Sequence, residues 1–118
     1  MSQTESYDGP AIRQIDETFS AVGQISPADV AGIAALGFKS LVCNRPDQEE
    51  PGQPSYAEIA DEAAKHGLSV TYIPVTGGVG PLPAQITAMR EFLETAPTPV
   101  LGYCRSGTRV GVIYDATK

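Results

Sequence analysis

The chain has 118 residues, 42% of them hydrophobic, and its 14 acidic and 8 basic side chains give a net charge of -6. This length suits one compact domain with its own core, and no apolar run is long enough to span a membrane. The acidic balance and the lack of a basic stripe exclude a typical nucleic-acid binder, and two cysteines are too few for a disulfide framework. We therefore expect one cytoplasmic domain over residues 12–118, after a disordered or extended segment over residues 1–11.

Strands and helices are predicted to alternate along the chain. In order, we expect a strand at 18–24, a helix from Ser26 to Gly37, a strand at 38–44, a loop at 45–54, a helix from Ser55 to about Gly67, a strand at 68–75, a glycine-rich loop at 76–80, a helix at 83–95, a strand at 99–103 and a helix from Val110 onward. The first helix is expected to bury Val30, Ile33, Ala34 and Leu36, and Ser55 with Glu58 forms a capping box. The pattern predicts an α/β fold with three layers, in which a mainly parallel sheet of four to five strands is flanked by helices.

Loops at one edge of this sheet are the expected place for a site. In parallel α/β sheets, ligands bind beyond the carboxyl ends of the strands. Three predicted loops meet there, at residues 45–54, 76–80 and 104–109. We therefore look for functional residues in these loops.

The segment Cys104-Arg105-Ser106-Gly107-Thr108-Arg109 follows the last strand and leads directly into a helix. A cysteine on such a turn faces backbone N–H groups and the positive end of the helix dipole. Gly107 lets the loop curl around an anion, and Arg105 and Arg109 add two positive charges. Together they favour the thiolate form of Cys104, so we predict a catalytic role for Cys104, as nucleophile, and for Arg109. A purely structural cysteine would leave the arginines and the glycine unexplained.

The remaining loop residues are assigned supporting roles in binding an anionic substrate. Ser106 is predicted to donate a hydrogen bond to the Cys104 thiolate, and Thr108 to cap the following helix. Arg45 begins a loop at the same edge of the sheet. It is predicted either to hold the substrate or brace the loop with Asp47, or else to form only a solvent-exposed ion pair, and the residue types do not decide between these.

Two further candidates have alternatives that the sequence leaves open. Cys43 ends the second strand and is either a resolving thiol for Cys104 or a small core residue. Asp47, Glu49 or Glu50 could supply a catalytic proton, although the two glutamates otherwise read as part of a solvated face. No cluster of residues has the spacing of metal ligands, so we expect neither a metal nor another cofactor.

Several motifs together resemble one bacterial family. They are Val22-Gly23-Gln24-Ile25-Ser26-Pro27, Asn44-Arg45-Pro46-Asp47, Glu50-Pro51-Gly52-Gln53-Pro54-Ser55, Ile73-Pro74-Val75 and the segment from Tyr103 to Arg109. The pattern resembles the phosphatase-like domain of beta-lactamase hydrolase-like proteins, which is also called a sulfur transferase, over about residues 12–112. This resemblance implies a fold like that of dual-specificity phosphatases and rhodanese-like enzymes. It also implies a persulfide dioxygenase, fused or separate, as a partner.

Two chemistries fit the resemblance, and the loop favours one of them. Arg109 follows Cys104 by five positions, as in rhodanese-type loops, whereas phosphatase loops place the arginine six positions after the cysteine. The loop at 76–80 lacks the carboxylate that phosphatases use to protonate the leaving group, and Tyr103 stands where tyrosine phosphatases usually have histidine. We therefore expect transfer of sulfane sulfur through a Cys104 persulfide to a small thiol or similar acceptor. The alternatives are phosphate hydrolysis through a Cys104 phosphocysteine and a non-catalytic anion-binding domain.

Overall fold

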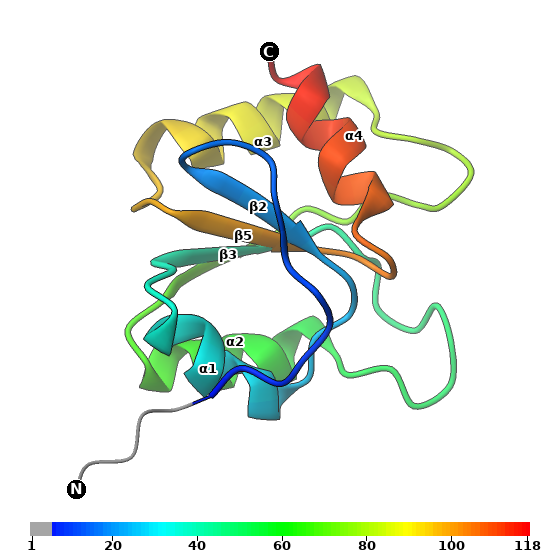
Figure 1. Cartoon of the computed structure of the whole chain (residues 1–118). Coiled ribbons are helices and arrows are strands. Elements are labelled where there is room, and N and C mark those ends of the chain that lie inside the picture. The colour runs from blue at the N-terminus through cyan, green and yellow to red at the C-terminus, as the bar shows by residue number, and fades with distance from the viewer. Residues whose placement is uncertain (1–5) are drawn as a thin grey trace, which may run out of the picture.

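The computed structural model describes residues 6–118, which form a single sheet with helices on both sides (Figure 1). The elements are β1 (Arg13–Gln14), β2 (Phe19–Val22), the 3-10 helix η1 (Pro27–Asp29), α1 (Val30–Ala35), β3 (Ser40–Cys43), α2 (Tyr56–Lys65), β4 (Ser69–Tyr72), α3 (Pro83–Thr95), β5 (Val100–Tyr103) and α4 (Thr108–Ala116). The expected strands and helices are all present, and α3 has the predicted bounds. The capping box that begins α2 is also confirmed, since Ser55 Oγ accepts the Glu58 N–H at 3.1 Å.

The sheet confirms the predicted mainly parallel α/β architecture. Its strand order is β1-β2-β5-β3-β4, and every neighbouring pair is parallel except β1 and β2. The antiparallel strand β1 was not predicted, because it is two exposed polar residues long and has no hydrophobic alternation. The strands that follow a helix are therefore parallel, as right-handed βαβ units require.

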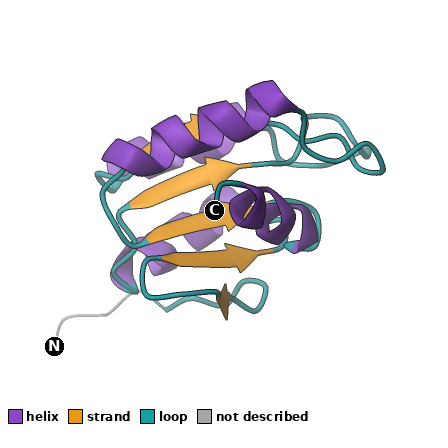
Figure 2. Ribbon diagram, turned by 90° about the horizontal axis from the view of Figure 1, so that it is seen from above, coloured by secondary structure: helices purple, strands orange, loops and turns teal. Residues whose placement is uncertain are grey.

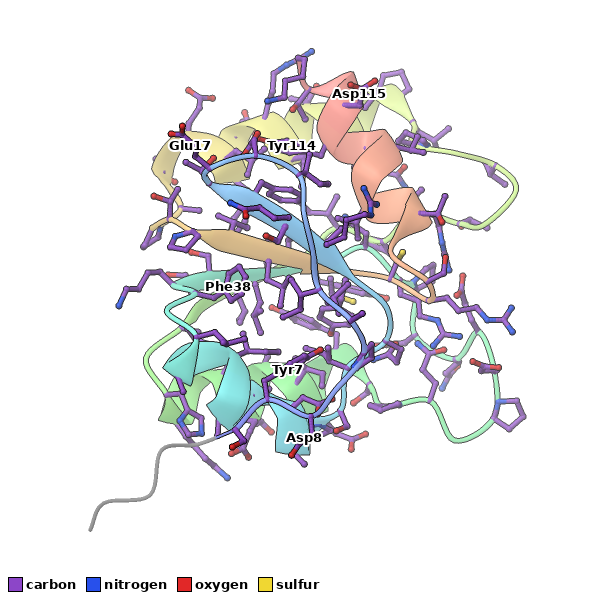
Figure 3. All side chains as sticks on the ribbon, in the orientation of Figure 1. Tyr7, Asp8, Glu17, Phe38, Tyr114 and Asp115 are labelled. Atoms are coloured by element: carbon purple, nitrogen blue, oxygen red, sulfur yellow. The ribbon has the colours of Figure 1, made fainter. Side chains whose placement is uncertain are left out.

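Each face of the sheet has its own core (Figures 1 and 2). Helices α3 and α4 cover one face, with Met89, Val110 and Ile113 buried against Phe19 and Val100. Helices α1 and α2 cover the other face, where a second core contains Val30, Ile33, Ile59, Leu41 and Leu101. Figure 3 shows this division through its labelled tyrosines, with Tyr7 in the layer of α1 and α2 and Tyr114 in the layer of α3 and α4.

One expectation differs from the structure in detail. Leu36 was expected on the buried face of the first helix, but it is 58% exposed because the helix ends at Ala35 and Leu36 starts the exit turn. Part of the N-terminal segment predicted to be disordered or extended, residues 1–5, lies outside the described residues. Within the rest of it, Tyr7 packs against the core between the sheet and α1 and α2.

The fold brings three loops to one edge of the sheet. The loops after β3, β4 and β5 all leave the sheet on the right-hand side of Figure 1, at the carboxyl ends of the strands. Helix α4 can pack tightly over β5 because Gly102 has no side chain. A Cβ atom there would lie 2.6 Å from Val110 Cγ1. Across residues 6–118, no helix has the length and apolar character needed to cross a membrane.

Candidate active site

Cys104 lies directly after β5, on the face of the sheet that α4 covers. Its side chain is fully buried, and its sulfur accepts a hydrogen bond from the Gly107 N–H at 3.0 Å. The Cys104 N–H in turn donates to the Val22 carbonyl at the end of β2. The thiol is therefore held in place from two directions, and a backbone donor is available to stabilise a thiolate.

The turn that presents this donor depends on Gly107 and on the neighbouring strand. Gly107 has a φ of 91° and stands immediately before α4, which begins at Thr108. A residue with a side chain is strained in this left-handed conformation, by roughly 1–2 kcal/mol. On the other side, Gln24 N–H donates to the Arg105 carbonyl, and a Cβ atom on Gly23 would meet that same oxygen at 3.0 Å. The conformation of the predicted anion-binding loop therefore depends on two glycines, Gly107 in the loop itself and Gly23 in the turn after β2.

Arg109 projects from the first turn of α4 toward the loops after β3 and β4. Its Nη1 donates to Glu49 Oε2 and to the Val75 carbonyl, both at 2.7 Å, and its Nη2 donates to Glu49 Oε1 at 2.8 Å. The pKa of Arg109 is raised, first by its hydrogen bonds to Glu49 and also by the nearby Cys104 sulfur. The guanidinium therefore lies between the Cys104 sulfur and a carboxylate from a different loop.

Arg45 is buried, and its partners differ from the predicted one. Only 2% of it is exposed, and its Nε, Nη1 and Nη2 donate to Glu49, Gln24 and Glu50 respectively. Asp47 is not a partner, so the predicted brace between Arg45 and Asp47 is wrong, and the alternative of a solvent-exposed ion pair is wrong because Arg45 is buried. A buried arginine with three satisfied nitrogens is an ordered part of this edge of the sheet.

The two glutamates are the residues that sequence reasoning misjudged. The Glu49 side chain is only 22% exposed although the residue as a whole lies on the surface, and it bridges Arg45 and Arg109. These arginines lower the pKa of Glu49 to about 2, with the hydrogen bond from Arg109 as the main cause, so the group is an anion at neutral pH. Glu50 pairs with Arg45 at 2.8 Å and lies 3.9 Å from Arg105. The sequence feature that could have predicted these ion pairs is the number of arginines at this edge of the sheet, because clustered cations need carboxylates nearby to balance their charge.

These side chains surround a small cavity of about 270 Å³. It is lined by Arg45, Glu49, Glu50, Thr76, Gly77, Arg105 and Arg109. Arg105 has a 69% exposed side chain, so it lies at the rim and is free to reach a ligand. A larger hollow of about 600 Å³ lies between β1 and α4. Cys104 lines neither hollow, and the smaller cavity is the candidate site because the loops after β3, β4 and β5 line it together. Its size and its arginines suit an anionic head group.

The hydroxyl groups of the loop do not have their predicted partners. Ser106 Oγ donates to Thr108 Oγ1 at 3.1 Å, and the hydrogen bond to the Cys104 sulfur comes from Gly107 instead. Thr108 is the first residue of α4 and makes no side-chain cap. Both predicted contacts are absent for the same reason. The turn at Gly107 points its backbone N–H at the sulfur, and the hydroxyl groups of Ser106 and Thr108 bond to each other instead.

Asp47 is engaged away from the cavity. Its Oδ1 accepts the Tyr56 N–H at 2.8 Å, at the start of α2, and its own N–H donates to the Tyr72 hydroxyl. It is absent from the cavity lining. In this arrangement Asp47 fastens the loop to α2 and β4, and it does not reach Cys104 as an acid would have to.

Cys43 lies on the opposite face of the sheet from Cys104. It pairs in register with Tyr103 and packs with the core under α1 and α2, whereas Cys104 belongs to the core under α3 and α4. Its thiol donates to the Arg45 carbonyl at 3.2 Å, and burial raises its pKa to about 11. A resolving thiol must be able to reach the Cys104 sulfur, but the structure places the two sulfurs on opposite faces of the sheet.

Comparison with known proteins matches nearly the whole described chain to one family. Residues 11–118 match the family described as "Beta-lactamase hydrolase-like protein, phosphatase-like domain". A beta-lactamase hydrolase-like protein of Agrobacterium fabrum is 37% identical over 101 residues, which cover 86% of this chain and 23% of that protein. The chain therefore spans about a quarter of the length of this relative.

Solved structures give the same fold. A crystal structure of a candidate phosphatase from Neisseria meningitidis is 36% identical, with a TM-score of 0.79, and the match covers 87% of this chain and 72% of that one. The catalytic core of the Saccharomyces cerevisiae PP-IP phosphatase Siw14, solved with citrate, has a TM-score of 0.65 at 19% identity, over 86% of this chain and 60% of that one. At that identity the second likeness concerns the fold alone.

Proposed function

The chain belongs to the family of phosphatase-like domains of beta-lactamase hydrolase-like proteins, and from this we propose that it hydrolyses phosphate esters or anhydrides through Cys104. The observation that supports this most is the hydrogen bond from the Gly107 N–H to the Cys104 sulfur, beside a cavity that Arg105 and Arg109 line. A buried sulfur with a backbone donor and nearby guanidinium groups is suited to act as a thiolate toward an anion.

The proposed reaction has two displacements at phosphorus. The Cys104 thiolate attacks, an S–P bond forms, and the P–O bond to the leaving group breaks with its electron pair. Water then attacks phosphorus, the S–P bond breaks, and inorganic phosphate leaves while the thiolate is regenerated. Arg109 and the loop N–H groups stabilise the charge on the phosphoryl oxygens in both steps.

The nearby carboxylates favour a particular kind of leaving group. Glu49 has a pKa of about 2 and is ionised at neutral pH, and Asp47 accepts a hydrogen bond from α2. Neither is poised to protonate a leaving oxygen, so that proton comes from solvent. We expect aryl phosphates and phosphoanhydrides to react much faster than alkyl phosphates, because their leaving groups depart as stable anions.

Sulfur transfer is the second candidate, because Arg109 follows Cys104 by five positions and a departing thiolate or sulfite needs no proton. The Cys104 thiolate would attack the outer sulfur of a persulfide or thiosulfate, forming a Cys104 persulfide and releasing a thiol or sulfite. A second thiolate would then take the sulfur. A persulfide dioxygenase would be a fitting partner for this activity. The family placement supports phosphate hydrolysis over this candidate.

A side-by-side assay separates the candidates. Purified protein is given an aryl phosphate in one arm, and thiosulfate or glutathione persulfide with cyanide or a thiol acceptor in the other. We expect phosphate release that vanadate inhibits, and intact-mass analysis after rapid quenching should find a phosphoryl group on the protein. Cys104→Ser should remove both the turnover and the adduct.

The other outcomes are equally clear. Thiocyanate formation, with one added sulfur on Cys104 and no phosphate release, would replace phosphate hydrolysis by sulfur transfer. Binding of phosphate without turnover in either arm would identify a non-catalytic anion-binding domain.

A further inference from the structure

The hydrogen bonds of Arg109 leave one edge of its guanidinium unused. Arginine has five N–H donors in a fixed planar fork. Both donors of Nη1 are used, by Glu49 Oε2 and the Val75 carbonyl, and one donor of Nη2 is used by Glu49 Oε1. Within residues 6–118, the second Nη2 donor and the Nε donor have no carbonyl or carboxylate partner. These two N–H groups point in the same direction and together match one pair of oxygens on an anion.

The Cys104 sulfur is close enough to Arg109 to raise its pKa, both by its charge and as a hydrogen-bond partner. Glu49 and the Val75 carbonyl take the other three donors, so the sulfur is reached through the Nε–Nη2 edge. Gly77 lies against the guanidinium, since a Cβ atom there would be 3.8 Å from Cζ. The guanidinium is thus held by Glu49, Val75 and Gly77, and the Nε–Nη2 edge is left for the sulfur and for an anion bound beside it.

Glu49 is itself held in place by the loop 45–54. Gln48, next to Glu49, has a φ of 63°, a left-handed conformation that is strained for a residue other than glycine. The side chain of Gln53 accepts the Glu49 N–H at 3.1 Å and donates to the Pro46 carbonyl at 2.9 Å. Arg45 Nε adds a third contact to the Glu49 carboxylate at 2.8 Å. A strained turn closed by these bonds keeps Glu49 in one position.

We propose that Glu49 is a positioning residue that fixes Arg109 with one edge open, so that the site binds a tetrahedral oxyanion through that edge. The inference rests on the proposed function for its choice of a phosphoryl group, but the binding itself requires no turnover. A carboxylate that merely competed with substrate would cover the donors that face Cys104, and Glu49 covers the opposite ones.

The experiment measures the affinity for inorganic phosphate by calorimetry, in the wild type, Glu49→Gln and Glu62→Gln. Glutamine has nearly the same shape but no charge, so it cannot hold two N–H groups of Arg109. We expect phosphate affinity to fall about tenfold in Glu49→Gln, as for lost charge-assisted hydrogen bonds. Glu62→Gln is the matched control, because Glu62 is a partly exposed glutamate that pairs with Lys65 and His66 on α2 and does not line the cavity. It should change phosphate affinity less than about threefold, as expected of a surface pair away from the site.

Three outcomes would decide the matter. Phosphate binding that is equal or tighter in Glu49→Gln would overturn the inference, since Glu49 would then be a competitor. No phosphate binding by the folded wild type would overturn it as well. Phosphate binding that weakens as expected, in a protein that hydrolyses no phosphate ester, would uphold the inference and refute the proposed hydrolase. If Glu49→Gln melts early, Glu49→Asp keeps the charge but shortens the reach, and it too should weaken binding.

Discussion

Two carboxylates in this protein have similar electrostatics but different surroundings. Asp16, between β1 and β2, accepts hydrogen bonds from the Tyr114 hydroxyl and from Thr18, and Lys118 lies 3.5 Å away. Glu49 binds Arg45 and Arg109. In both cases the pKa is lowered to about 2, by the Tyr114 hydrogen bond for Asp16 and by the Arg109 hydrogen bond for Glu49.

The difference lies in what the partners leave unused. The Asp16 cluster is closed, because the Tyr114 hydroxyl donates to Asp16 and accepts from Lys118, and the Tyr114 ring stacks on Phe19 with centroids 3.9 Å apart. It fastens the end of α4 to the sheet, at the opposite end of the helix from the loop 104–107, and Figure 3 labels Tyr114 there. In the Glu49 cluster, by contrast, two donors of Arg109 have no carbonyl or carboxylate partner within residues 6–118. We therefore assign the Asp16 cluster to stability and, under our proposal, the Glu49 cluster to anion binding.

The largest expected effect comes from changing Arg109 while keeping its charge. Arg109→Lys cannot reproduce the planar fork, so it loses both the Glu49 pair and the open edge. We expect kcat/KM for an aryl phosphate to fall by about 100-fold or more, the range for removing one key charge-stabilising donor. Tyr114→Phe is the matching change in the closed cluster. It should leave kcat/KM unchanged and lower stability by about 1 kcal/mol, or roughly 4 °C in Tm.

Two results with these variants would contradict the contrast drawn between the Asp16 cluster and the Glu49 cluster. If Tyr114→Phe lost activity without unfolding, the two clusters would be coupled through α4. If Arg109→Lys kept most of its activity, charge alone would suffice and the geometry of the fork would be irrelevant.

A smaller effect is expected on thermal stability at low pH, where the Asp16 cluster and the Glu49 cluster should behave alike. The pKa of each carboxyl group is about 2 in the folded protein, below the value of about 4 typical of an unfolded chain. Their contributions to stability are therefore present above about pH 4 and are lost as the pH falls through about 2. Melting curves of the wild type, Asp16→Asn and Glu49→Gln should differ at pH 7 and converge near pH 2. A gap in Tm that persisted near pH 2 would show that packing, and not ionisation, accounts for the loss in that variant.

The sequence predicted the fold better than it predicted contacts within the site. Alternating hydrophobic segments and capping residues determine local structure, so α3 and the α2 capping box were predictable. The position of Cys104 followed from the same logic, as the residue after a buried strand. The partners of Arg45 could not be predicted, because whether Asp47 or Glu49 turns inward depends on the left-handed turn at Gln48. Likewise, the separation of Cys43 from Cys104 depends on strand register, which sends their side chains to opposite faces.

The smallest effect is expected at Cys43, and it tests that separation. Burial raises the pKa of the Cys43 thiol to about 11, and its sulfur packs under α1 and α2. Cys43→Ala should therefore keep activity within about twofold and cost about 1 kcal/mol of stability, as for a small cavity. Labelling with iodoacetamide at pH 7 should modify Cys104 in the wild type and in Cys43→Ala alike, and no cysteine in Cys104→Ser. A Cys43–Cys104 disulfide found by mass spectrometry after mild peroxide treatment would contradict this, because its formation requires both thiols to reach one face of the sheet.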